Sequence, residues 1–159
     1  MLTLAVAVLA APAASAARDL PNAGEIRAEI DRSGAQAVVQ RLIDDSEWDI
    51  VQNAIMRGDG AWVALAPALA PGTDGGVSEG LGIGLAYALP RNPEAVLRVL
   101  DLTDSTSLGP RHICSAPFIE PSPAFLAQYR SVTRKALASV RDGDLAPAKS
   151  ACLRALTGG

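Results

Sequence analysis

The chain has 159 residues and a net charge of −3, and 49% of its residues are hydrophobic although only 4% are aromatic. The negative charge argues against nucleic acid as a partner, and a chain of this length can bury a core without a cofactor. Ala and Leu are strong helix formers, whereas clusters of strand-forming residues are few. The composition therefore favours an all-α fold with no cofactor.

The first residues have the features of a secretory signal peptide. An apolar run of about ten residues ends in Ala14-Ser15-Ala16, a small-residue cleavage pattern. The run is shorter than the roughly 20 apolar residues of a spanning helix. We therefore expect a signal peptide over 1–16, a single helical domain over 17–159, and no membrane span after cleavage. Because Ala, Leu, Arg and Pro are abundant and Lys is scarce, we expect a bacterial protein that is periplasmic or secreted.

The chain has two cysteines, Cys114 and Cys152. In an oxidising compartment a lone pair predicts a disulfide, which would stabilise the fold by about 4 kcal/mol in the chain-entropy model. Free thiols and a metal site that combines His112 with Cys114 are the alternatives. Two ligands do not make a site, and an oxidised Cys114 cannot bind metal, so no metal is expected.

Two helices are expected in the first part of the mature chain. Apolar residues recur at helical spacing from Glu25 to Asp45, and Ser33-Gly34 interrupts them, which predicts two short helices or one bent helix. Acidic residues gather at the junction to the next helix, where negative charge favours a helix N-terminus. These residues are Asp44, Asp45, Glu47 and Asp49.

The next helices are marked by residues that begin and end helices. Ser46 with Asp49 resembles a capping box, and Gly58 is suited to end that helix. Asp59 is expected to cap the following helix, which Pro67 must kink or end because it removes a backbone donor.

A glycine-rich loop over 71–76 precedes a helix expected at about 78–89. Within this helix Gly80, Gly84 and Ala88 share one face, and small residues there allow a neighbouring helix to approach closely. The alternative interpretation of the loop is a partner-binding segment.

The C-terminal half combines a long irregular segment with three helices. Asn92-Pro93 is a strong helix start, the segment over 101–121 is irregular, and helices are expected over 122–141 and 146–156. The predicted core stripe of the longer helix is Phe125, Leu126, Tyr129, Val132, Ala136, Leu137 and Val140.

The middle of the chain resembles HEAT-like helical-hairpin proteins over residues 44–100, which implies helical hairpins. We therefore expect an all-α fold of helical hairpins, either HEAT-like or an irregular bundle, to which the cysteine pair adds one disulfide. The stretches LAPALAPGTDGG and ALPRNPEAVLRVL are also similar to small exported bacterial proteins of unknown activity. The expected hairpins begin at Glu47 and Gly60, and at Ser78 and Asn92.

The candidate binding residues are two acids of the glycine-rich segment and the two tryptophans. Asp74 and Glu79 are placed to meet basic groups of a partner. Trp48 and Trp62 are core anchors if buried, or an interface hot spot if exposed. No catalytic motif is present, so no catalytic residue is assigned.

The expected function is that of a protein-interaction module of the cell envelope, for example one that masks or inhibits a protein partner. The charge is uneven, with nine acids against four arginines over 19–59 and nine bases against six acids from Arg91 onward. Such a dipole can steer a partner. The alternatives are a small envelope hydrolase that uses carboxylates, and a structural envelope protein with no fixed partner.

Overall fold

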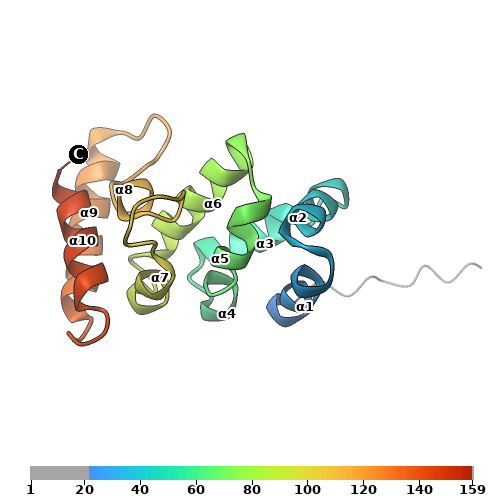
Figure 1. Ribbon diagram of the computed structural model, residues 1–159. Helices are drawn as coiled ribbons and strands as arrows, with labels where there is room; N and C mark the ends of the chain where they lie inside the picture. The colour runs from blue at the N-terminus through green and yellow to red at the C-terminus, as the bar shows by residue number, and fades with distance from the viewer. Residues whose placement is uncertain (1–21, 159) are drawn as a thin grey trace, which may run out of the picture.

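The computed structural model describes residues 22–158, and within that range the chain forms helices and no strand (Figure 1). The all-α prediction is confirmed. The predicted signal peptide, 1–16, lies outside the described residues. In chain order the elements are α1 (Ala23–Ser33), α2 (Ala35–Asp44), α3 (Trp48–Met56), α4 (Gly60–Val63), α5 (Ala66–Leu69), the 3-10 helix η1 (Ala70–Gly72), α6 (Gly75–Ala88), α7 (Pro93–Val99), α8 (Pro110–Ile113), α9 (Pro123–Ser139) and α10 (Ala146–Thr157).

The helices follow one another from one end of the molecule to the other. α1 and α2 lie at one end, α6 runs through the middle, and α9 and α10 form the opposite end (Figure 1). One hydrophobic core cluster extends from Ile26 in α1 to Leu156 in α10. Along this described part of the chain, no helix is long and apolar enough to cross a bilayer.

The N-terminal end is a pair of short helices. Asn22 begins α1 with a capping box, because its side chain accepts from the Glu25 amide at 2.9 Å and the Glu25 carboxylate accepts from the Asn22 amide. Gly34 then separates α1 from α2, so the two-helix alternative is correct. A Cβ on Gly72 of η1 would lie 2.4 Å from the Ala35 carbonyl carbon, so only glycine permits this close approach.

The start of α3 differs from the prediction. Ser46 has a φ of 60°, its side chain makes no cap, and Glu47 occupies the N-cap position without a side-chain cap bond. The Ser46 amide donates to the Ile43 carbonyl in the turn that ends α2. Ser46 therefore serves the tight turn, and the expected capping box with Asp49 is wrong.

Two further boundaries differ from the prediction, because α6 begins at Gly75 within the expected loop and the short helix α8 lies in the segment expected to be irregular. Several others agree with it. Gly58 ends α3 with a φ of 79°, which a glycine adopts without strain. The segment around Pro67 is divided into the short helices α4, α5 and η1, as expected for an interior proline. The predicted side-chain caps are present at Asp59, Asn92 and Ser122.

The glycine face of α6 packs against α3, its most extensive partner. A Cβ on Gly80 would lie 2.9 Å from Gln52 Nε2, and one on Gly84 would lie 3.6 Å from Ile55 Cγ2. Gln52 Nε2 also donates to the Gly80 carbonyl at 3.0 Å. The close approach predicted from the small-residue face is therefore confirmed. This packing holds α6 against α3, and another side of α6 contacts α8.

The C-terminal end is fastened by the predicted disulfide. Cys114, directly after α8, joins Cys152 in α10, and their Cα atoms are 5.2 Å apart. The core face of α9 differs from the predicted stripe, because Val132 is 47% exposed whereas Thr133 is fully buried. α9 packs through Tyr129, Thr133 and Leu137, which follow one another at four-residue spacing.

Candidate functional site

The two acids proposed from the sequence lie at the start of α6. Asp74 is the N-cap residue, although its side chain makes no cap bond, and Glu79 lies in the second turn. Both side chains are exposed. Neither carboxylate has a hydrogen bond or ion pair within residues 22–158. Both acids are therefore available to an outside partner, and Glu79 lines a cleft whereas Asp74 lies beyond it.

The cleft beside Glu79 lies between α6 and α8 and has a volume of about 470 Å³. Both walls carry polar groups: Ser78 and Glu79 come from α6, and Arg111 and His112 come from α8. The remaining lining residues are Gly75, Gly82, Ile83, Ser107 and Pro117. Glycine at Gly75 and Gly82 keeps side chains out of the space and so widens the cleft.

A second hollow of about 750 Å³ adjoins this cleft. Ser78 and Ser107 line both hollows, and the two neighbouring hollows are together named the α6 groove below. The second part is more apolar, with one wall from the α5–η1 segment and the other from the end of α7 and the loop that follows. Its lining residues are Pro67, Ala70, Pro71, Thr73, Ser78, Arg98, Val99, Leu100, Asp101, Thr106, Ser107 and Leu108.

The loop over 101–108 forms a wall of the α6 groove and is held by its own polar groups. The Asp101 carboxylate accepts hydrogen bonds from the hydroxyls of Thr103 and Ser105 and from the Thr106 amide. These hydrogen bonds, that from the Thr103 hydroxyl first, hold the pKa of Asp101 well below its usual range. Asp101 therefore shapes the loop and is not a free acid of the groove.

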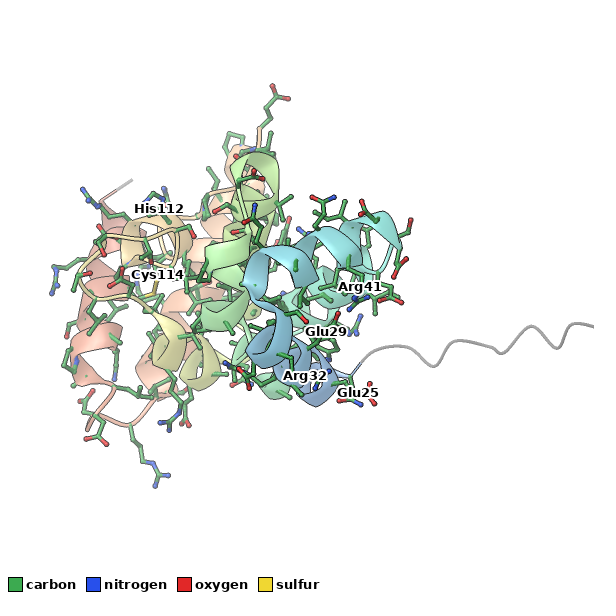
Figure 2. The ribbon with its side chains drawn as sticks, turned by 45° about the vertical axis from the view of Figure 1, so that its right-hand side comes forward. Glu25, Glu29, Arg32, Arg41, His112 and Cys114 are labelled. Atoms are coloured by element: carbon green, nitrogen blue, oxygen red, sulfur yellow. A yellow bond between two sulfur atoms is a disulfide. The ribbon has the colours of Figure 1, made fainter. Side chains whose placement is uncertain are left out.

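The neighbouring cation of α8 is also held within the fold. Arg111 forms an ion pair with Asp104, and a Cβ on Gly109 would collide with the Asp104 side chain. His112 has no side-chain hydrogen bond in the described residues and is exposed at this end of the molecule (Figure 2). Arg111 thus fixes the wall, and His112 is the group of α8 that remains free.

The α6 groove brings a carboxylate, an imidazole and two serines together without assembling a catalytic set. No hydrogen bond joins Glu79, His112 or Ser78 to one another in residues 22–158. Across the same residues no three His, Cys, Asp or Glu side chains are grouped to hold a metal ion. Because Cys114 is in the disulfide, it cannot be a metal ligand with His112. The geometry suits hydrogen bonding to a bound segment.

The tryptophans lie in or against the core. Trp48 is 9% exposed and belongs to the core cluster, and Trp62 is partly buried against that cluster. Their placement matches the core-anchor interpretation of the sequence. A partner that met Trp48 would have to displace the packing of α3.

The acidic cluster before α3 is partly neutralised by Arg41 of α2. Arg41 donates to Glu29 at 2.6 and 2.7 Å and to Glu47 at 2.7 Å, and Figure 2 shows Arg41 beside Glu29. The hydrogen bond to Glu29 raises the pKa of Arg41 above its usual value. Through Arg41, Glu29 of α1 and Glu47 before α3 are connected to α2.

A further groove, separate from the α6 groove, was not predicted from the sequence. Tyr87 at the end of α6 and Phe125 and Tyr129 of α9 line a groove of about 390 Å³, named the aromatic groove below. The few aromatic residues of the chain could have drawn attention to this surface. However, Tyr87 and Phe125 are too far apart in sequence for residue spacing to indicate that they meet.

The comparisons with known proteins leave the chain without an assigned family. No protein-family model matches it, and no curated protein or solved structure shows significant similarity to it.

Proposed function

We propose that the protein is an exported module of the bacterial cell envelope that binds an extended segment of a partner protein in the α6 groove. The observation that carries this proposal is the set of polar side chains that face the groove without a partner in the described chain. These side chains are Ser78, Glu79, Ser107 and His112.

The shape of the α6 groove supports a chain-like ligand. Its two parts, of about 470 and 750 Å³, meet at Ser78 and Ser107. The polar part offers hydrogen-bonding groups to a peptide backbone, and the apolar part, with Val99 and Leu108, offers contacts to side chains. Binding sites of this kind combine apolar walls with a few polar groups that fix orientation. Glu79, with Asp74 nearby on the same helix, favours a segment that carries a basic residue.

The disulfide supports the export part of the proposal. Disulfides persist in oxidising compartments such as the periplasm, and the Cys114–Cys152 bond holds α8, one wall of the groove, against α10. A wall that is fixed before binding reduces the entropy lost when a partner docks. Binding that occludes the partner's segment would mask or inhibit that partner.

The test is affinity capture from an envelope extract of the source organism, with the disulfide-intact mature protein as bait. We expect one stoichiometric partner. The double variant Asp74→Ala/Glu79→Ala should lose it, because the carboxylate that lines the groove and the one next to the groove are both removed. The matched control is Asp31→Ala/Asp49→Ala, which removes two exposed acids at the N-terminal end and should retain the partner. Equal capture by both double variants, or no retained partner, would refute the proposal.

A further inference from the structure

The aromatic groove lies beside four of the six aromatic residues of the chain. The whole chain has two Trp, two Tyr and two Phe, and both tyrosines and both phenylalanines meet at this one place. Phe118 is central, with ring centroids 4.7 Å from Tyr87, 5.0 Å from Phe125 and 4.7 Å from Tyr129. Tilted and edge-on contacts of this kind hold aromatic rings in a defined arrangement.

The walls of the aromatic groove are fixed by hydrogen bonds. The buried Tyr129 hydroxyl donates to the Ala86 carbonyl at 2.9 Å. Arg91 donates to the Tyr87 carbonyl at the end of α6, which places its guanidinium beside the groove. The groove is therefore largely formed before any ligand arrives, as small binding sites usually are.

An apolar side chain stands exposed at the same groove. Val132 lines it and is 47% exposed, although its position in α9 was expected to be buried. Gln128, one turn earlier on the same face, adds an amide that can donate or accept. Exposed apolar surface beside an aromatic hollow is typical of an interaction site.

The helices beside this groove carry positive charge. α9 and α10 contain five basic residues and no acidic residue. Lys135 follows Val132 by three positions and so shares its face of α9. Lys135, and Arg134 on the same helix, make no ion pair within residues 22–158. None of the residues that line the aromatic groove is acidic, and Arg91 adds a further positive charge.

We propose that the aromatic groove is a second docking site, which takes an acidic segment of a partner protein that inserts one aromatic or large aliphatic side chain between Tyr87, Phe125 and Val132. The apolar hollow accepts the anchor, and Arg91 and Lys135 attract the acidic flanks. The groove is concave, whereas a membrane surface is met by protruding apolar side chains. The proposal is independent of the α6 groove, because the two grooves share no residue.

The test is selection of a phage-displayed library of random peptides on the disulfide-intact protein. We expect the enriched peptides to carry an aromatic or large aliphatic residue flanked by Asp and Glu. Their affinity, measured by isothermal titration with the synthetic peptide, should fall as sodium chloride is raised. Val132→Asp and Arg91→Ala should each weaken binding by about tenfold or more.

The controls match these variants in chemistry and exposure. Leu102→Asp adds a charge at a position that is 50% exposed, close to the 47% of Val132, and Arg32→Ala removes an exposed arginine at the other end of the molecule. Both should bind the peptide as the parent does, and thermal melting should show all four variants folded. The double variant Asp74→Ala/Glu79→Ala should also retain binding.

Several outcomes would overturn the proposal. They are the absence of any enriched peptide whose binding is weakened by Val132→Asp, and the absence of acidic residues from the peptides that Val132→Asp does weaken. Binding of phosphatidylglycerol vesicles, with no peptide enriched, would identify the surface as a membrane contact instead.

Discussion

The two ends of the molecule carry opposite charges and use them differently. At the N-terminal end, Arg41 forms ion pairs with both Glu29 and Glu47, and these ion pairs connect α1, α2 and α3. At the C-terminal end, Lys149 pairs with Asp142, but Arg134, Lys135 and Arg154 have no ion pair within the described chain. The difference teaches that net charge does not by itself mark a binding surface.

The ends are also held together by different means. The α1–α2 pair is attached by partly buried ion pairs and by the close contact of Gly72 with Ala35. The C-terminal end is attached by a covalent bond between α10 and the residue after α8. We therefore expect the N-terminal end to respond to salt and to loss of Arg41, and the C-terminal end to respond to reduction.

The largest expected effect follows from removing the disulfide. Cys114 and Cys152 are 38 positions apart, and opening such a loop should lower the free energy of unfolding by about 4 kcal/mol in the chain-entropy model. Cys114→Ala/Cys152→Ala tests this in urea titrations, with hydrogen exchange rising in α8 and α10 before α1. Reductant should shift the parent but not this variant. A parent that is unaffected by reduction would contradict the assignment.

A smaller effect is expected at the opposite end. Arg41→Met leaves Glu29 and Glu47 without their partner, and we expect a loss of about 1–2 kcal/mol in the free energy of unfolding. Added salt should weaken the parent and leave the variant nearly unchanged. Arg57→Met, at an exposed arginine after α3, is the matched control and should cost little. Equal losses in the two variants would show that the Arg41 ion pairs contribute no stability.

The smallest expected effect concerns the aromatic groove and pH. Burial raises the pKa of Tyr129 to about 12, so the fold favours the neutral phenol. This contribution is fully present below the ordinary tyrosine pKa of about 10 and is lost as the pH rises through the folded value. Tyr129→Phe should lose about 1 kcal/mol at neutral pH with the hydrogen bond to Ala86, and its stability should fall less between pH 10 and 12.

The control for this pH dependence is Tyr87→Phe, which leaves Tyr129 in place. Thermal melting across the alkaline range should show the full decline in that variant. If Tyr129→Phe declined as steeply as the parent, another group would be responsible.

The parts of the fold that could be predicted depend on neighbouring residues. Asp59, Asn92 and Ser122 cap their helices because a cap is a contact across two or three positions. The face shared by Gly80 and Gly84 indicated close helix packing for the same local reason. Ser46 was misassigned because the tight turn after α2 required its backbone in a left-handed conformation, and the capping pattern alone does not reveal that requirement.

The sites could be predicted only in part, because they depend on contacts between distant segments. Glu79 was identified from its neighbourhood in the sequence, but its cleft exists only because α8 and Ser107 lie opposite it. The aromatic groove was missed because Tyr87 and Phe125 meet through tertiary packing. Val132 was assigned to the core from helical spacing, but in the middle of α9 the neighbouring Thr133 is buried instead.

The measurement that tests the central claim most directly is hydrogen–deuterium exchange of the protein alone and saturated with the captured envelope partner. The proposal predicts protection of amides in the first half of α6 and over 107–112, on the two walls of the α6 groove, with α1 and α2 unchanged. Protection restricted to α9 or to the N-terminal end, with the α6 groove unchanged, would contradict it.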